Sequence, residues 1–308
     1  MGEEHGDIGR VAVIGAGTMG AQIAAQTAFS GRSVALYDAV PDALERGMHR
    51  IQEEILPAIE AAGRLSGSAG EAANRIHAAS SLEGAVGGVD LVIEAVREDA
   101  ATKRTVFQAL SPLAPAAILG TNSSSLPSSV VADVVERPER LLNMHFFAPI
   151  WVRPMLELMS SGATSDDVLA AARRFGESLG LVTATVQGQS KGFIINRIWR
   201  AVKRESLRVV DEGHAQPEDI DRLWMMFFQT EHAPFGVMDM VGLDVVADIE
   251  ASYQAVSVDP SDQPSTTLHR MIAEGKLGEK SGEGFYHHPN PEYRQRGFLN
   301  GSQEGERE

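Results

Sequence analysis

Four polar side chains have the types needed to oxidise a secondary alcohol, namely His145, Glu157, Ser124 and Asn196. A histidine has a pKa near neutrality, so His145 could take the proton from a secondary alcohol. A carboxylate on its other ring nitrogen fixes the tautomer and stabilises the imidazolium, and Glu157 could do this if the two strands are neighbours. Ser124 and Asn196 could hydrogen-bond the substrate oxygen. The same chemistry needs a hydride acceptor.

Three of these residues also have an ordinary structural explanation. His145 could be a core histidine with satisfied hydrogen bonds, and Glu157 could belong to a structural salt bridge, because buried acids are usually paired. The choice of Ser124 is open, because serines are common in turns and Ser123 or Ser125 could point inward instead.

A turn with the spacing Gly-x-Gly-x-x-Gly provides a candidate site for the hydride acceptor. Its residues are Gly15, Gly17, Thr18, Met19 and Gly20. The apolar residues 11–14 before it predict a buried strand, and residues 21–29 predict a helix. In that context the first glycine makes the turn, the second lets a pyrophosphate approach, and the third lets the helix pack on the strand. The alternative is a glycine-rich turn that binds nothing.

The next predicted strand, residues 33–37, ends at Asp38. A carboxylate at this place can accept hydrogen bonds from the adenosine ribose hydroxyls, and it repels the 2′-phosphate of NADP. No basic residue occurs among residues 39–41. We therefore predict that the cofactor is NAD.

Composition excludes several classes of function. The 308 residues are 43% apolar and include no cysteine, which rules out disulfides and thiolate metal sites and fits a cytoplasmic protein. We predict no metal site. The net charge of −15 argues against nucleic acid and anionic membranes as partners. The chain has no run of 18 apolar residues, and its acidic start is unlike a signal peptide, so we expect no membrane span.

The pattern of strands and helices changes near residue 188. Before it, short apolar strands alternate with helical stretches, which is typical of an α/β domain with a doubly wound, mostly parallel sheet of the Rossmann type. After it, the pattern is helical throughout. We therefore predict a nucleotide-binding domain over residues 1–188 and an all-helical domain over 189–308, with a disordered tail after about residue 290. The strands predicted after residue 40 are 91–95, 117–121, 143–147, 155–159 and 181–186, and the helices are 42–61, 193–212, 217–228, 237–253 and 266–274.

The helical domain contains a continuous apolar run over residues 224–228. Such a run is buried either inside the domain or between two subunits, and the sequence does not choose between them. We predict a homodimer in which the helical domain forms the interface.

Five segments together with the glycine turn resemble the L-3-hydroxyacyl-CoA dehydrogenase family, in the right order and over nearly the whole chain. They are residues 122–126 (NSSSL), 145–149 (HFFAP), 192–197 (GFIINR), 241–244 (VGLD) and 276–286 (KLGEKSGEGFY). The resemblance implies NAD as cofactor and His145, Glu157, Ser124 and Asn196 as the catalytic set. It also implies cofactor-binding positions at Glu98, Lys103, Ser124 and Lys280. For Glu98 and Lys103 the alternatives are a solvated acid at a helix start and a surface lysine.

The chain departs from the family pattern near both expected ligands. Ala148 stands where the family has an asparagine, and Lys191 stands where it has a proline. Residues 52–61 (QEEILPAIEA) are acidic and without lysine where the family offers a serine and lysines to the coenzyme A phosphates. Trp151 and Arg153 follow the histidine segment and could shape a substrate pocket or meet an anionic group, unless they form an ordinary surface loop.

We expect an NAD-dependent dehydrogenase that acts on an L-3-hydroxyacyl thioester, such as a short 3-hydroxyacyl-CoA. The missing lysines keep open a free hydroxy acid, a carnitine-like alcohol or a carrier-bound acyl group as the substrate. They also predict that the coenzyme A phosphates contribute less than about tenfold to kcat/KM, unless Arg46, Arg50 or Arg64 supplies the charge. A lysine-based hydroxyacid dehydrogenase and a non-enzymatic NAD-binding scaffold fit the residues less well.

Overall fold

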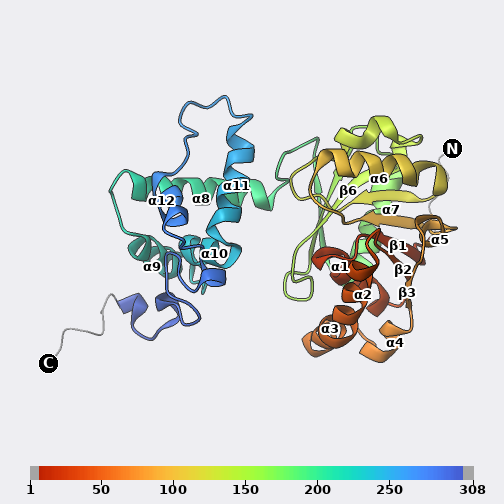
Figure 1. Ribbon diagram of the computed structural model, residues 1–308, viewed down its shortest axis with the longest axis horizontal. Coiled ribbons are helices and arrows are strands. Elements are labelled where there is room, and N and C mark those ends of the chain that lie inside the picture. The colour runs from red at the N-terminus through yellow and green to blue at the C-terminus, as the bar shows by residue number, and fades with distance from the viewer. Residues whose placement is uncertain (1–6, 301–308) are drawn as a thin grey trace. The chain divides into compact units, whose positions relative to one another are not determined.

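The computed structural model describes residues 7–300, and the chain divides between Ile195 and Asn196 into two compact units (Figure 1). The first unit contains a β-sheet covered by helices, and the second contains helices and loops without a strand in its described part. The segment 189–195 thus belongs to the first unit, although the sequence pattern placed it in the second.

One eight-stranded sheet forms the centre of the first unit, in the order β3-β2-β1-β4-β5-β6-β7-β8. All neighbours are parallel except β6 and β7, which are antiparallel. Each strand predicted from the sequence is present, and the short β3 is an addition. The strands are β1 (Arg10–Ile14), β2 (Ser33–Tyr37), β3 (Ile76–Ala78), β4 (Leu91–Glu94), β5 (Ile118–Thr121), β6 (Leu141–Phe146), β7 (Met155–Ser160) and β8 (Val182–Val186).

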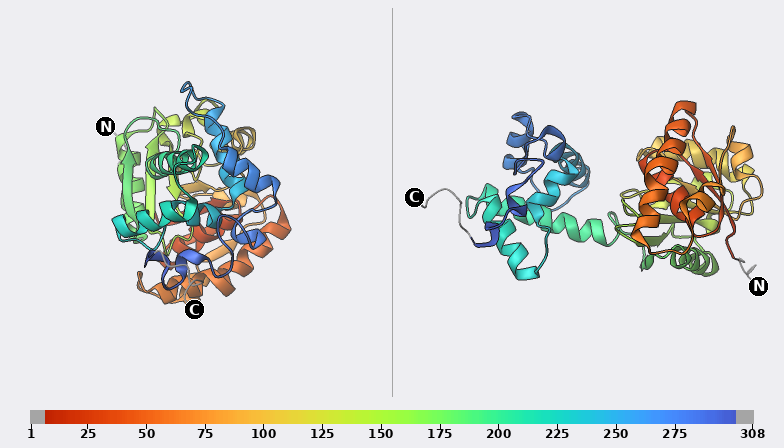
Figure 2. Two further views of the ribbon diagram at one scale, coloured as in Figure 1. Left: turned by 90° about the vertical axis from the view of Figure 1, so that its left-hand side faces the viewer. Right: turned by 90° about the horizontal axis from the view of Figure 1, so that it is seen from below.

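Helices cover both faces of this sheet, as the views in Figure 2 show. Alternate residues of a strand point to opposite faces, so Val11 and Val13 enter one apolar core while Ala12 and Ile14 enter the other. Both cores are needed because a parallel sheet is buried on both sides. The helices are α1 (Thr18–Phe29), α2 (Pro41–Arg50), α3 (Leu56–Ala62), α4 (Ala69–Ala73), α5 (Leu82–Val86), α6 (Ala100–Leu113) and α7 (Asp166–Ser178).

The long helix predicted over residues 42–61 is present as three consecutive pieces. Between α2 and α3 the residues Ile51–Ile55 form a π-helical turn, in which Ile51 and Ile55 are buried and the acids between them are exposed. Gly63, with φ of +63°, ends the helical stretch.

The second unit consists of five α-helices in its described part. They are α8 (Ile195–Asp211), α9 (Pro217–Phe228), α10 (Pro234–Val241), α11 (Leu243–Gln254) and α12 (Thr266–Ala273). The helix predicted over 237–253 is divided at Gly242, which has φ of +97°. Within residues 7–300 even α8, the longest helix, is too short and polar to cross a membrane.

The expectation of disorder after residue 290 is wrong for residues 290–300. Two short 3-10 helices, Glu292–Arg294 and Phe298–Asn300, follow there. Tyr293 and Phe298 are buried in the apolar core of the second unit, and this burial holds the segment in place. The remainder of the predicted tail, residues 301–308, lies outside the described residues.

The apolar run at the end of α9 is mostly exposed within this chain. Met225 is buried, but Leu223, Met226, Phe227 and Phe228 have relative exposures of 66%, 55%, 80% and 55%. Trp224 is half-buried and packs against the core of the second unit. The alternative that the run forms an internal core is therefore wrong for Met226, Phe227 and Phe228, whereas Trp224 and Met225 do pack inward.

Candidate active site

The glycine turn brings the ends of three strands together. Gly15 has φ of +105°, and its N–H donates to the Tyr37 carbonyl of β2 at 2.7 Å. A Cβ at Gly15 would lie 2.6 Å from the carbonyl oxygen of Ala95, just after β4. Only glycine fits this conformation and this close approach. The turn therefore lies at the carboxyl edge of the sheet, where ligands bind in such folds.

The same turn is open where phosphates would approach. A Cβ at Gly17 would have no other atom within 4 Å, and α1 begins at Thr18 without a side-chain cap on its N-terminal N–H groups. Asp38 is half-buried beside it and accepts hydrogen bonds from the N–H groups of Ala16 and Val40. Free N–H groups for a pyrophosphate and a fixed carboxylate for a ribose fit a dinucleotide such as NAD.

His145 and Glu157 face each other on neighbouring strands, as the sequence argument required. They are directly opposed in the antiparallel pair β6–β7, and the distance from His145 Nδ1 to Glu157 Oε2 is 3.0 Å. Both side chains are buried. This contact assigns Nδ1–H to the carboxylate and leaves Nε2 to exchange a proton. The structural explanations considered for these two residues are compatible with a catalytic role. The same hydrogen bond that satisfies the buried His145 and Glu157 side chains also orients the His145 ring.

The second oxygen of Glu157 is also fixed. Glu157 Oε1 accepts the N–H groups of Ile194 and Ile195 at 3.1 and 2.9 Å. The His145 ring packs against Phe193, with 5.1 Å between ring centroids. Asn196 is the next residue along the chain and the first of the second unit.

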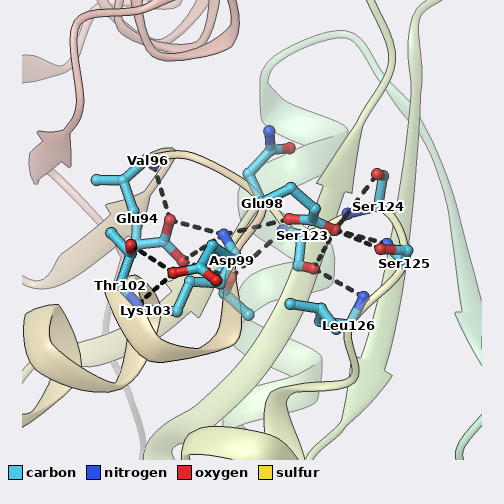
Figure 3. A network of polar contacts seen from close by, with 12 residues as sticks. Glu94, Val96, Glu98, Asp99, Thr102, Lys103, Ser123, Ser124, Ser125 and Leu126 are labelled. Atoms are coloured by element: carbon cyan, nitrogen blue, oxygen red, sulfur yellow. Dashed lines mark hydrogen bonds and ion pairs between the residues drawn. The ribbon is translucent and has the colours of Figure 1, made fainter. Parts of the chain in front are cut away.

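A buried ion pair lies at the carboxyl end of β4 (Figure 3). Lys103 Nζ, from the first turns of α6, lies 2.8 and 3.0 Å from the two oxygens of Glu94. Glu94 also accepts hydrogen bonds from Thr121 Oγ1 and the Val96 N–H. The side chains of Lys103 and Glu94 are 3% and 0% exposed. Lys103 is therefore not the surface lysine that the sequence allowed as an alternative.

Glu98 joins this ion pair to the serine turn after β5. Lys103 Nζ lies 3.4 Å from Glu98 Oε2, while Glu98 Oε1 accepts hydrogen bonds from the Ser123 hydroxyl and the Ser124 and Ser125 N–H groups (Figure 3). Burial raises the pKa of Glu98, but the Lys103 ammonium and the hydrogen bonds from the serine turn outweigh it and lower the pKa overall. Glu98 is thus held as a carboxylate at the rim of the site.

The contacts of Glu98 bear on which serine can meet a substrate. The Ser123 hydroxyl is buried, donates to Glu98 at 2.6 Å and accepts the Leu126 N–H. The Ser125 hydroxyl donates to Glu98 at 2.9 Å. The Ser124 hydroxyl has the longest contact with Glu98, 3.4 Å. The role of Ser124 toward a substrate stays a prediction.

Two asparagines tie the serine turn to the histidine strand. Asn122 Oδ1 accepts the Phe146 N–H at 2.9 Å, and Asn143 bonds to Ser128 N–H and the Leu126 carbonyl oxygen. The serine turn and His145 therefore belong to one rigid edge of the sheet.

The loop after β6 holds the unusual residues of this chain. Trp151 is half-buried and packs against the larger apolar core, while Arg153 is exposed and donates to the Ala148 carbonyl oxygen. Arg153 is therefore fixed at the place where the family has its asparagine. A role for either side chain toward a substrate stays a prediction.

Lys280 lies in the second unit and forms an ion pair with Asp244. This contact joins the two C-terminal motifs of the sequence, residues 241–244 and 276–286. A role of Lys280 toward the cofactor stays a prediction.

Sequence reasoning missed the part played by Glu94, Ser123 and Ser125. The sequence shows Glu94 as an acid at the end of a strand. Lys103 follows nine residues later, and this spacing is the signal that could have identified the pair. The serines gave no separate signal, because only the fold brings Glu98 over their turn.

Comparison with known proteins identifies both units. Residues 10–189 match the family described as 3-hydroxyacyl-CoA dehydrogenase, NAD binding domain, and residues 192–288 match 3-hydroxyacyl-CoA dehydrogenase, C-terminal domain. The chain is 34% identical over 285 residues to the probable 3-hydroxybutyryl-CoA dehydrogenase of Bacillus subtilis, covering 91% of this chain and 97% of that protein. The match to the NAD-binding family confirms the expectation of NAD as cofactor.

Two further relatives indicate the range of substrates in this group. The crystal structure of (S)-3-hydroxybutyryl-CoA dehydrogenase PaaH1 from Ralstonia eutropha superimposes with a TM-score of 0.84 at 31% identity, covering 91% of this chain and 99% of that one. The 5-formyl-3-hydroxy-2-methylpyridine 4-carboxylate 5-dehydrogenase of Mesorhizobium japonicum is 32% identical, over 91% of this chain and 90% of its own length.

Proposed function

Since the chain belongs to the 3-hydroxyacyl-CoA dehydrogenase family and is an NAD-dependent oxidoreductase, we propose that it oxidises a short L-3-hydroxyacyl thioester, such as 3-hydroxybutyryl-CoA, to the 3-ketoacyl form. The observation that carries this proposal is the His145–Glu157 pair, 3.0 Å apart, on the same sheet edge as the serine turn and the glycine turn. The relatives described above supply the substrate class.

His145 is the general base in this proposal. Its Nδ1–H is held by Glu157, so Nε2 is the atom that accepts the proton of the substrate hydroxyl. Glu157 then stabilises the imidazolium that results. Ser124 and Asn196 are the proposed hydrogen-bond donors to the substrate oxygen. NAD, when bound at the glycine turn, supplies the hydride acceptor.

Glu98 and Lys103 keep the serine turn in its working shape. Lys103 is fully occupied by Glu94 and Glu98, so it acts through Glu98. Glu98 in turn holds three consecutive serines by one oxygen atom. A hydrogen-bond donor that is held in place in this way costs little reorganisation during the reaction.

A second candidate function is the oxidation of a free hydroxy acid or a carnitine-like alcohol. Arg153, fixed beside the histidine strand by the Ala148 carbonyl oxygen, could pair with a substrate carboxylate. The relative from Mesorhizobium japonicum, whose name includes a carboxylate, favours the same idea.

Initial rates of NADH formation on a small substrate panel separate the two candidates. The panel contains L-3-hydroxybutyryl-CoA, the same acyl group on pantetheine, L-gulonate and carnitine. We expect turnover of the thioesters and little or none of the free hydroxy compounds. Turnover of L-gulonate or carnitine alone would replace the thioester proposal by the second candidate. The variant Arg153→Gln should then lose activity on carboxylates, whereas it should change thioester turnover less than about threefold.

The exposed apolar end of α9 supports a homodimer. Leu223, Met226, Phe227 and Phe228 form an apolar patch with a hollow of about 630 Å³ beside it, and such patches rarely stay open in a monomer. We propose that a second copy of the chain covers this patch. We also propose a cytoplasmic location, because a sequence without cysteine fits a reducing compartment.

Light scattering tests the homodimer directly. The expected mass at micromolar concentration is twice the 33.1 kDa of one chain. Phe227→Asp should shift the protein to the monomer mass, whereas Val258→Asp, at a position 98% exposed outside the patch, should leave the dimer intact. A monomer in the unchanged protein would remove this proposal.

A further inference from the structure

Helix α8 begins at the boundary between the two units, and its first turn carries Asn196. Just before this turn, Glu157 Oε1 accepts the N–H groups of Ile194 and Ile195. The carboxylate that pairs with His145 therefore also holds the chain where it enters the helix. Helix ends fray unless other groups hold them, so the first turn of α8 is stable only if it is also anchored within the second unit.

Arg200 lies one helical turn after Asn196, on the same face of α8. Its Nη2 donates to both carboxylate oxygens of Asp262, at 2.6 and 2.8 Å, and its Nε donates to Glu250 Oε2 at 3.0 Å. The guanidinium also lies over the Tyr253 ring, 4.5 Å from the ring centroid. Arg200 thus joins the beginning of α8 to α11 and to the loop of residues 255–265 that precedes α12.

This cluster is ionic and largely buried. The side chains of Arg200, Glu250 and Asp262 are 16%, 9% and 2% exposed. The side chain of Lys203, which is 4% exposed, lies 3.1 Å from Glu250 Oε1, so two cations face two carboxylates. Burial raises the pKa of Asp262, but its hydrogen bonds with Arg200 and Ser257 outweigh burial and lower the pKa overall.

Stability alone does not explain such a cluster. Taking charges out of water is costly, and apolar residues of similar volume often stabilise a protein equally well or better. The second unit already has an apolar core, which includes Phe235 and Met238. A guanidinium bound to two carboxylates differs from apolar packing in one respect, because its hydrogen bonds have fixed directions and so define how the joined elements are oriented.

We propose that Arg200 is a positioning residue that fixes the first turn of α8 and thereby directs Asn196 toward the substrate oxygen. Glu250 and Asp262 hold the guanidinium, and Arg200 itself does not touch the substrate. Asn196 then lies between two anchors along the chain, Glu157 before it and Arg200 one turn after it. The inference rests on the proposed function for the role of Asn196, and not for the anchoring of α8.

The test compares the unchanged protein with the double variant Arg200→Met/Asp262→Asn. This variant removes a cation and its anion together, so neither of the two buried charges is left without the other. The matched control is Arg204→Met/Asp259→Asn. It makes the same change one turn further along α8, in a more exposed ion pair of 3.6 Å that joins the same helix to the same loop.

Amide hydrogen exchange measured by mass spectrometry tests the anchoring without any substrate. We expect exchange in the N-terminal turns of α8 to be at least about tenfold faster in the double variant, with little change in the sheet or in the control. Unchanged exchange in these turns would overturn the anchoring, and so would an increase spread over the whole chain, because that is a general loss of stability.

The single variant Arg200→Lys keeps the positive charge but lacks the planar fork that binds two carboxylates. We expect its exchange rate in the first turns of α8, and its kcat, to lie between those of the unchanged protein and the double variant. If the double variant does not fold, Arg200→Lys takes its place in every measurement.

Initial rates on the substrate of the panel that is oxidised best test the consequence for catalysis. We expect kcat of the double variant to fall about ten- to hundredfold, because a donor displaced by about 1 Å can cost this much. The KM for NAD should change less than about twofold, since the glycine turn belongs to the first unit, and the control should keep its kcat. In an Asn196→Ala background the double variant should lower kcat no further, because Arg200 acts through Asn196.

The outcomes separate this inference from the proposed function. A normal kcat in the double variant, or a loss that multiplies with the loss in Asn196→Ala, would overturn the positioning role. A normal kcat in Asn196→Ala would overturn it as well, because Asn196 would then have no role to support. An unchanged protein that oxidises no thioester contradicts the proposed function, whereas hydrogen exchange still decides whether Arg200 anchors α8.

Discussion

Acids that accept several hydrogen bonds occur in both units of this protein, and their partners differ. In the first unit Glu94 and Glu98 bind side chains, namely the Lys103 ammonium and hydroxyl groups of Thr121 and the serine turn, at the open edge of the sheet. In the second unit Asp221 accepts the N–H groups of Phe235 and Gly236 and the hydroxyl of Tyr286. Within residues 7–300, no cation is among the hydrogen-bond partners of Asp221.

A second acid of the helical unit repeats this arrangement. Asp239 on α10 accepts the N–H groups of Phe285 and Tyr286 and lies 3.1 Å from His288 Nε2. Together Asp221 and Asp239 fasten residues 285–288 to helices α9 and α10. The C-terminal motif of the sequence therefore includes a structural clamp.

The pKa values of Asp221 and Asp239 in the second unit are raised, whereas the pKa of Glu98 in the first unit is lowered. Burial raises the pKa of Asp221 to about 6 against the effect of its three hydrogen bonds, and burial also raises the pKa of Asp239. Desolvation acts on Glu98 as well, but the Lys103 charge and the serine hydrogen bonds lower its pKa. Burial alone therefore does not identify a catalytic acid; the kind of partner and access to a ligand do.

The largest expected effect distinguishes catalysis from stability. His145→Gln should lower kcat by about 10²–10⁴, because general-base catalysis is lost, while the NAD dissociation constant changes only a few-fold. Glu157→Gln should cost less, because the base remains and only its orientation weakens. Initial rates measure kcat, titration measures the NAD dissociation constant, and the melting temperature measures stability. A His145→Gln enzyme with near-normal kcat would contradict the assignment of the base.

The next effect belongs to the helical unit. Asp221→Asn should destabilise the protein by roughly 2–4 kcal/mol, since the amide nitrogen cannot accept the buried donors that face the carboxylate. Because the pKa of Asp221 is raised from 3.8 to about 6 in the folded state, the stability linked to its proton is fully present below about pH 3.8 and is lost as pH rises through about 6.

The free energy of unfolding from denaturant titration, measured between pH 4.5 and 7, checks the sign. The difference in the free energy of unfolding between the unchanged protein and Asp221→Asn should widen as pH falls through about 6. NAD affinity should be unchanged below the melting temperature. A gap that narrows toward low pH would show that the carboxylate form is the one that stabilises the clamp.

Asp38 tests whether an acid that holds backbone N–H groups can also serve a ligand. It accepts the Ala16 and Val40 N–H groups, as the acids of the clamp accept theirs, but it lies at the open edge. We expect at least a tenfold preference for NAD over NADP in kcat/KM, because a lost ribose contact and phosphate repulsion each cost about 1–2 kcal/mol. Equal use of both cofactors would mean that Asp38 is structural only.

The smallest effects come from a matched pair of hydroxyl deletions. Ser125→Ala removes one donor from Glu98, and Tyr286→Phe removes one from Asp221, each worth about 1 kcal/mol or somewhat more. Ser125→Ala should raise the pKa of Glu98 and move the acid limb of kcat/KM to higher pH, with little change in melting temperature. Tyr286→Phe should lower the melting temperature and leave the pH profile unchanged. If both variants changed the pH profile, or both changed the melting temperature, the distinction between the two units would be wrong.

The sequence by itself determined the family, the cofactor class and most of the elements. Hydrophobic runs are local signals, and polar residues such as Asp38, Glu94 and His145 appear at or near their ends. Strand 33–37 and helix 217–228 were predicted to the residue. The alternation of strand and helix was enough to predict the doubly wound sheet, because parallel strands need helical crossovers.

Only the tertiary structure decided which side chains share a site. The His145–Glu157 contact depends on the register of two antiparallel strands, and the Glu98–serine contacts join residues 25 to 27 positions apart. These contacts follow from long-range packing, which local periodicity does not specify, because a strand pattern gives the face of each residue and not its neighbour across the sheet.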